Sequence, residues 1–219
     1  MTAIADYRTR IRALLIDAAS AIYANATVDE ALLQALDEYS QACPLEMDTV
    51  ITLPGDSREI ALNGVSGLLA VTDVYWPFDS TDEPWPPNRA QGFYIYWDDT
   101  QPVLYLNQID GDEPQLDDEL RLWYTKRHTI DGLDSASETT VPGQHDSLLV
   151  AGAAGFAALS RTIDLIEVTS ADQYMTGLLG VWAQRKIKEF RTALEVIKRA
   201  KSRGGMPYSQ GWKLDKWDA

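Results

Sequence analysis

The hydrophobic period of the chain changes twice, and this change constrains the fold more than any other feature. Apolar residues recur at helical spacing over residues 1–45, at alternate positions through much of 46–139, and at helical spacing again over 140–203. Helices need a period near 3.6 and strands a period of 2, so the pattern predicts an α+β fold. We expect residues 1–45 and 140–203 to form one helical core, 46–139 an inserted β-domain, and 204–219 an extended C-terminal arm.

The N-terminal segment is expected to fold as a pair of antiparallel helices. Apolar residues at helical spacing predict the first helix over residues 4–23. Thr27 followed by Glu30 is a capping-box pattern at the start of the second helix, and Pro44 should end it.

Two further helices are expected after residue 140, which completes a predicted helical bundle. Within the apolar run Leu148–Leu159, the small residues Ala151–Gly155 would let another element approach closely, inside the chain or in a neighbouring subunit. Ser170 followed by Gln173 resembles a capping box, and a long helix should run from Ala171 to about Ser202.

The middle of the chain is expected to form an antiparallel β-sandwich or barrel of about five or six strands. A turn at Pro54-Gly55-Asp56 should join the first two strands as a hairpin, and Asp98–Gln101 should form the loop of a second hairpin. The predicted strands are Met47–Leu53, Arg58–Leu62, Leu68–Trp76, Phe93–Trp97, Val103–Leu106 and Glu119–Thr129.

Charge is distributed unevenly along the chain. The net charge of −14 argues against a protein that coats DNA or binds an anionic membrane. Residues 1–140 carry 25 acids and 8 bases, whereas 141–219 carry 8 acids and 11 bases. The bases concentrate in the last predicted helix, which could dock on a polyanion or an acidic partner, or could be a solvated face favoured by the helix dipole. The candidate residues are Arg185, Lys188, Arg191, Lys198 and Lys201.

The sequence contains no recognisable catalytic or metal-binding motif, so we expect neither an enzyme nor a cofactor or metal. The two histidines are His128 and His145. A triad of His145 with its neighbours Asp146 and Ser147 is unlike a catalytic one, because adjacent residues point in different directions. The acidic stretch 110–119 departs from the EF-hand ligand spacing.

The expected site of folding is a reducing cytoplasm. The single cysteine, Cys43, cannot form an intramolecular disulfide and is expected to be a buried apolar residue. The N-terminal residues lack the apolar core of a signal peptide, and Leu148–Leu159 is shorter than the roughly 20 residues that span a bilayer.

Aromatic residues in the predicted β-domain allow two interpretations. Trp85-Pro86-Pro87 with Tyr94, Tyr96 and Trp97 could form a platform on which sugars stack. Aromatic residues at alternating strand positions more often fill a core, and we favour that interpretation.

The order of these parts resembles the head-to-tail connector (adaptor) proteins of tailed bacteriophages. The segments that carry the resemblance are Leu122–Ile130, Thr140-Val141-Pro142 and Ser147–Ala154, which look like the strand-to-helix passage of phage virion proteins of that type. The simplest adaptors are almost wholly helical, so the β-domain would be an insertion whose role the family does not supply.

The resemblance implies a virion structural protein, made in the host cytoplasm, that forms a dodecameric ring in the neck of the virion. Such a ring binds the portal protein on one side and a tail or stopper protein on the other, and DNA passes through it. The basic helix face would contact the portal or the DNA, and aromatic arm residues would bind the portal or a neighbouring subunit. These arm residues are Tyr208, Trp212, Leu214 and Trp217. The alternative is a glycan-binding β-sandwich module of a phage or cellular surface protein.

Overall fold

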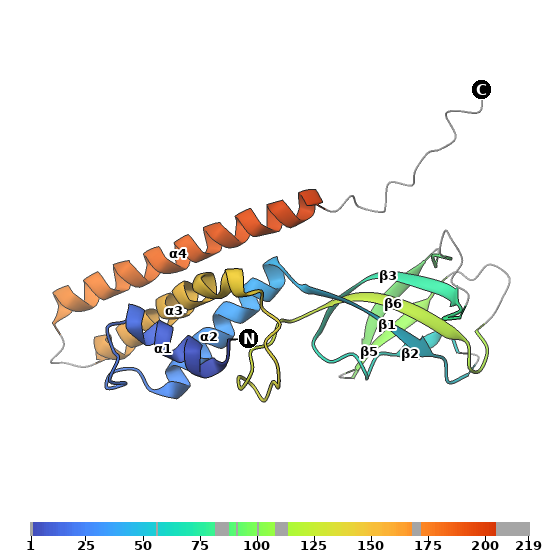
Figure 1. Cartoon of the computed structure of the whole chain (residues 1–219), viewed down its shortest axis with the longest axis horizontal. Helices are drawn as coiled ribbons and strands as arrows, with labels where there is room; N and C mark the ends of the chain where they lie inside the picture. Colours follow the sequence, from blue (N-terminus) through green and yellow to red (C-terminus); the bar gives the residue numbers. More distant parts are fainter. Residues whose placement is uncertain are drawn as a thin grey trace, which may run out of the picture. The chain divides into compact units, whose positions relative to one another are not determined.

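The computed structural model describes residues 2–55, 57–81, 88–90, 92–99, 101–107, 114–167 and 172–204. In these residues the chain is a mixed α+β protein with four α-helices and two antiparallel three-stranded sheets. Figure 1 shows the helices and strands in sequence colours. The α+β prediction is therefore confirmed. The chain divides into two compact units, which are described separately. The helical unit comprises residues 1–43 and 128–219, and the β unit comprises 44–127.

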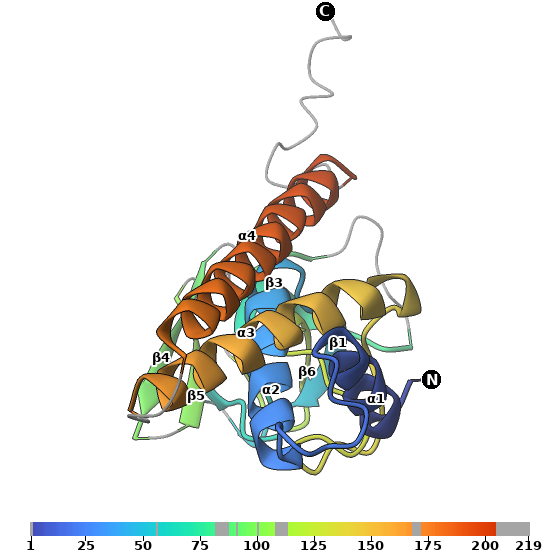
Figure 2. The same cartoon turned by 90° about the vertical axis from the view of Figure 1, so that its left-hand side faces the viewer.

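Helix α3 is the centre of the helical unit and packs against α1, α2 and α4 (Figure 2). The elements are α1 (Ile4–Leu14), α2 (Asn25–Ala42), the short 3-10 helix η1 (Gly143–His145), α3 (Asp146–Glu167) and α4 (Gln173–Gly204). Burial of one apolar face from each helix produces a single core. Its largest fully buried side chains are Tyr7, Ile11, Leu32, Tyr39 and Phe190.

Helix α1 is shorter than predicted. It ends at Leu14 because Ile16 adopts a left-handed backbone conformation with φ 56°. The buried Asp17 carboxylate then accepts the backbone N–H groups of Ala21, Ile22 and Tyr23, which shapes the following loop. The predicted helix over residues 15–23 is therefore wrong, because this side chain offers the backbone an alternative to helical hydrogen bonds.

The predicted capping box at Thr27 misplaces the start of α2, and the one at Ser170 is not tested. Helix α2 begins at Asn25, before Thr27, and its first turn has no side-chain cap. Ser170 lies outside the described residues. At the start of α4, Oδ1 of Asp172 accepts the N–H groups of Tyr174 and Met175 at 2.9 and 3.4 Å. Asp172 thus satisfies donors that a helix N-terminus leaves free.

The β unit contains two sheets, with strand orders β1-β6-β3 and β2-β5-β4. The strands are β1 (Leu45–Thr52), β2 (Glu59–Ala61), β3 (Leu68–Phe78), β4 (Phe93–Asp98), β5 (Gln101–Leu106) and β6 (Glu119–Lys126). The predicted β4–β5 hairpin is confirmed, with Asp98 opposite Gln101. The described strands do not close into one barrel.

The predicted β1–β2 hairpin is wrong. Strand β1 pairs with β6, with Leu45 opposite Lys126, whereas β2 pairs with β5. Strands far apart in the sequence pair because both sheets contribute apolar side chains to one core. A hairpin of β1 and β2 would not fill that core. The fully buried members of this core include Leu53, Ile60, Leu62, Leu104, Leu106, Leu120 and Leu122.

Residues 128–139, which we expected in the β-domain, belong to the helical unit. The His128 N–H donates to the hydroxyl of Ser40 on α2 at 3.0 Å, and the Ile4 N–H donates to the Asp131 carbonyl. Ile130 and Leu133 are buried in the helical core. These contacts fix the segment against α1 and α2.

One helical segment, residues 143–166, is long and apolar enough by length and composition to cross a membrane. More than half of its most apolar window is buried inside the protein, as in the central helix of a folded unit. Most of this segment is α3, whose buried residues pack on the neighbouring helices.

Candidate functional site: two faces of helix α4 and an adjoining groove

Helix α4 packs on α3 through an unusually close contact. A Cβ atom added at Gly152 would lie 2.8 Å from the ring of Phe190, and one at Gly155 would lie 3.0 Å from Ile187. Ala153 and Ala154 are fully buried between them. The small-residue block therefore serves packing inside the chain, one of the two roles expected from the sequence.

The side of α4 opposite its buried residues carries exposed apolar side chains along the N-terminal half of the helix. We call four of these residues the apolar face: Tyr174, Met175, Leu178 and Val181. Their exposed fractions run from 48% at Leu178 to 72% at Tyr174. Clustered exposure of this kind is typical of a surface that contacts another protein.

The C-terminal half of α4 is basic, and part of its charge is neutralised by ion pairs. Arg185 and Lys186 contact Glu189 at 3.0 and 2.9 Å. Hydrogen bonds from Lys186 and Arg185 lower the pKa of the Glu189 carboxyl. Arg191 binds both carboxylate oxygens of Glu38 on α2, at 2.5 and 2.9 Å.

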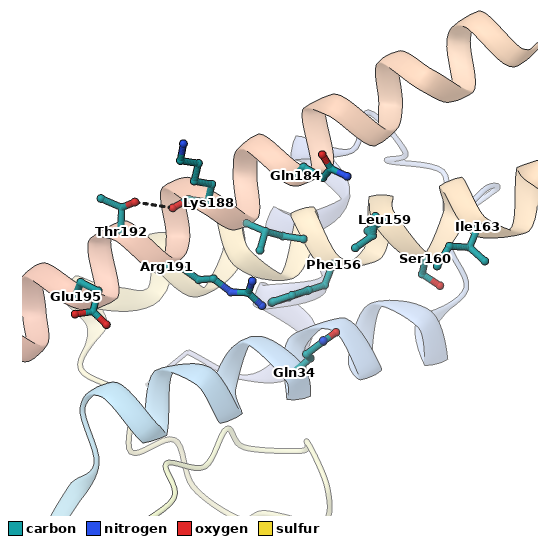
Figure 3. Close-up of a pocket in the computed structure, with 11 residues that line it drawn as sticks. Gln34, Phe156, Leu159, Ser160, Ile163, Gln184, Lys188, Arg191, Thr192 and Glu195 are labelled. Atoms are coloured by element: carbon teal, nitrogen blue, oxygen red, sulfur yellow. Dashed lines mark hydrogen bonds between the residues drawn. The ribbon is translucent and has the colours of Figure 1, made fainter.

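A groove of about 770 Å³ lies along α4, between it and helices α2 and α3 (Figure 3). Phe156, Leu159 and Ile187 give it apolar walls, and polar side chains surround them. Figure 3 shows Arg191 extending from α4 toward Phe156 and α2, whereas Lys188 points away from α2. The other lining residues are Gln34, Ser160, Ile163, Gln184, Thr192 and Glu195.

The five predicted basic residues have different surroundings. Arg185 and Arg191 form ion pairs with Glu189 and Glu38. Lys201 also takes part in a hydrogen-bonding or electrostatic interaction. Lys188 and Lys198 are exposed and form no ion pair with any residue that the structure describes. Lys198 lines a smaller groove of about 360 Å³ with Glu38 and Arg191. Lys188 and Lys198 are thus the cations of this set best placed to meet a partner.

The predicted arm residues Tyr208, Trp212, Leu214 and Trp217 lie outside the described residues, and so does the loop Trp85-Pro86-Pro87. Their proposed roles stay predictions.

The fold brings both histidines into contact with Tyr39, a juxtaposition that the sequence did not predict. The Tyr39 hydroxyl is 2.7 Å from Nδ1 of His145, and its ring centroid is 5.1 Å from that of His128. Burial raises the pKa of the Tyr39 hydroxyl, and the neighbouring Cys43 thiol adds to the rise. Among the described residues, no group of three His, Cys, Asp or Glu side chains could hold a metal ion.

The expectation that the β-domain aromatics fill its core is wrong for two of them. Tyr94 and Trp97 are 48% and 63% exposed. Tyr94 stacks on Tyr105 of the neighbouring strand, with ring centroids 4.9 Å apart, and lies 6.1 Å from Tyr96. Strand alternation explains the exposure of Tyr94, since the side of β4 that carries Tyr94 is opposite the one on which Ile95 packs against the core. Trp97 is on the same side as Ile95 but next to Asp98, the last residue of the strand.

Comparison of the sequence with models of protein families and with curated proteins found no match.

Proposed function

We propose that the protein is a head-to-tail connector (adaptor) of a tailed bacteriophage, which forms a ring in the virion neck between the portal and a tail or stopper protein. In this proposal the helical unit is the adaptor bundle, the β unit is an inserted sandwich, and residues 204–219 are an arm that binds the portal or a neighbouring subunit. The order of elements along the chain supports the proposal. The proposal rests on the resemblance of the segments described above to phage connector proteins.

The observation that carries the proposal is the apolar face. Its four exposed side chains lie along the N-terminal half of α4, and burial of one such side chain contributes about 1.5–3 kcal/mol. We propose that a second copy of the chain covers this face. The contact would be heterologous, with the apolar face of one subunit against a different surface of the next, because contacts of that kind generate rings.

Two valines of α4 provide a matched test. Val181 belongs to the apolar face and Val196 does not, yet they are 66% and 63% exposed. We expect Val181→Asp to prevent assembly in the presence of the portal protein from the same genome, and Val196→Asp to permit it. Native mass spectrometry of the protein with and without the portal measures the subunit number. A protein that stays monomeric with the portal would contradict the proposal, as would equal assembly of the two variants.

The exposed lysines of α4 would contact the portal or the DNA in the channel. Contacts of this kind are independent of sequence and weaken with salt. The double variant Lys188→Gln/Lys198→Gln is expected to reduce portal docking or DNA retention and to make the remaining interaction less sensitive to salt. Unchanged docking and unchanged retention would exclude this role for the two lysines.

The proposed arm can be tested by truncation after Arg203. We expect the truncated protein to keep its helical far-UV circular dichroism and to bind the portal more weakly, because Trp and Tyr side chains contribute much of the energy of interfaces. Portal binding with unchanged affinity would show that the arm is not the anchor.

A further inference from the structure

Sheet β2-β5-β4 presents a cluster of tyrosines on one side, which we call the tyrosine face: the exposed Tyr94 and the half-buried Tyr96 and Tyr105, with Glu59. Tyr94 and Tyr105 are directly opposite each other on β4 and β5, and Glu59 of β2 is opposite Tyr105. The three strands therefore place one aromatic ring after another across the sheet and end at a carboxylate.

Acidic groups surround the hydroxyl of Tyr96. Partial burial raises the pKa of Tyr96, and the nearby carboxylates of Glu59 and Asp98 raise it further. The exposed groups around the rings are thus hydrogen-bond acceptors with negative charge.

Acidic residues outnumber basic ones around this sheet. Strands β2, β4 and β5 contain Glu59 and Asp98 but no lysine or arginine, and Arg58 directly precedes β2. The whole β unit carries 16 acidic and 5 basic residues. Two of those bases, Arg89 and Arg121, pair with Asp73 and Asp48. The potential at the tyrosine face is therefore negative, which attracts cations and repels polyanions.

Aromatic rings and carboxylates together match one ligand chemistry. The face of a tyrosine ring attracts a lysine ammonium or an arginine guanidinium, and carboxylates accept hydrogen bonds from the same groups. We propose that the tyrosine face binds a lysine- and arginine-rich segment of a partner protein. This role goes beyond the proposed connector function and does not depend on a ring, because the face lies entirely in the β unit.

A neutral glycan is the competing ligand, since sugars also stack on tyrosine. Charge complementarity favours the cationic segment: a neutral sugar gains nothing from the excess of 11 negative charges in the β unit. The two ligands differ in their response to salt, because screening weakens the binding of a cationic peptide and leaves stacking of a neutral sugar almost unchanged.

The test uses the full-length protein and a fluorescent peptide of Arg-Gly-Ser repeats, with a Gln-Gly-Ser peptide as the neutral probe. Fluorescence anisotropy should show binding of the arginine peptide that weakens as salt rises, and no binding of the glutamine peptide. Tyr94→Ala should weaken binding about two- to fivefold, the loss expected for one exposed cation–π contact. Tyr94→Phe should keep most of the affinity, because a phenylalanine ring also attracts cations.

Two controls separate the tyrosine face from general attraction to an acidic protein. Trp97→Ala removes a more exposed aromatic residue that strand alternation places on the other side of β4, and it should leave the affinity unchanged. Glu59→Gln should weaken binding, whereas Asp164→Asn, the same loss of charge on α3, should not.

A second measurement guards against variants that fold poorly. In the wild-type protein labelled with fluorotyrosine, the peptide should shift the ¹⁹F signals of Tyr94, Tyr96 and Tyr105, which single Tyr→Phe variants assign. Equal effects of the face variants and their controls would overturn the proposal. Shifts of these signals by maltohexaose or chitohexaose, without binding of the arginine peptide, would overturn it in favour of a glycan site.

Discussion

The hydroxyl of Tyr7 on helix α1 donates a hydrogen bond to the carboxylate of Asp146, with the two oxygens 2.5 Å apart. Asp146 is 139 residues away in the sequence and lies in the first turn of α3. Asp146 is almost fully buried and also accepts the hydroxyl of Thr2 at 2.7 Å. A carboxylate at a helix N-terminus is favoured by the helix dipole, and its burial requires donors of this kind. The pair therefore ties the N-terminal helix to the central one.

Removal of the Tyr7 hydroxyl should destabilise the helical unit. Tyr7→Phe leaves a buried carboxylate oxygen without its donor, at a cost of about 1–3 kcal/mol in the free energy of unfolding. Tyr23→Phe is the matched control, since Tyr23 is buried in the same core and its hydroxyl has no hydrogen-bond partner among the described residues. Urea unfolding followed by helical circular dichroism compares the two. Equal losses would show that Asp146 does not depend on this donor.

Two helical glycines should respond oppositely to alanine. At Gly152 the new Cβ would lie 2.8 Å from the buried ring of Phe190, so Gly152→Ala should destabilise the protein by about 1–3 kcal/mol. At Gly177 on α4 a Cβ would meet nothing within 4 Å. Gly177→Ala should therefore stabilise the helix by about 0.5–1 kcal/mol. Thermal unfolding of both variants measures the difference, and a stabilising Gly152→Ala would mean that α3 and α4 separate easily.

Protonation of His128 should weaken the helical unit. The imidazole is buried, with Nε2 3.0 Å from the Cys43 carbonyl and Nδ1 3.1 Å from Thr140. Burial lowers the pKa of His128, although the carbonyl contacts partly oppose the shift. Below the ordinary histidine pKa of about 6.5 the unfolded chain then binds a proton that the folded protein does not, so stability should fall as the pH falls.

This pH dependence can be assigned with the two histidine variants. In His128→Gln the unfolding free energy should decrease less between neutral pH and pH of about 5 than it does in the wild type. His145→Gln retains His128, so the part of the decrease that His128 causes should remain. Urea titrations at several pH values provide the measurement. A slope that survives in His128→Gln would assign the effect to other groups.

Local patterns predicted the elements that are stabilised by neighbours in the sequence. The periodicity of α4 predicted its length to within two residues at each end, and the loop after Asp98 predicted the β4–β5 hairpin. In both cases the contacts that form the element join residues a few positions apart in the sequence. The spacing of apolar and turn residues is therefore enough to predict the element.

Contacts between residues far apart in the sequence could not be predicted from such local patterns. The pairing of β1 with β6 joins Leu45 to Lys126, and the cluster around Tyr39 joins α2 to residues about a hundred positions later. No spacing in the sequence encodes which of several apolar strands will share a core. The tyrosine face was missed for a related reason: alternation places Tyr94 and Ile95 on opposite sides of β4, but which side is buried depends on the second sheet.

The loop that ends α1 should depend on one carboxylate. The N–H of Tyr23 lowers the pKa of Asp17 most, burial opposes the shift, and the N–H groups of Ile22 and Ala21 lower it further. A lowered pKa means that the stabilisation is present above the ordinary aspartate pKa of about 3.9 and is lost as the pH falls through the folded value. Asp17→Ala should remove this stabilisation at neutral pH.

The amide protons of residues 21–23 in Asp17→Ala should then exchange faster with solvent. Asp6→Asn, which changes an exposed residue on α1, should leave their exchange unaltered. Equal protection of these amides in Asp17→Ala and in the wild type would show that the loop is held by other contacts.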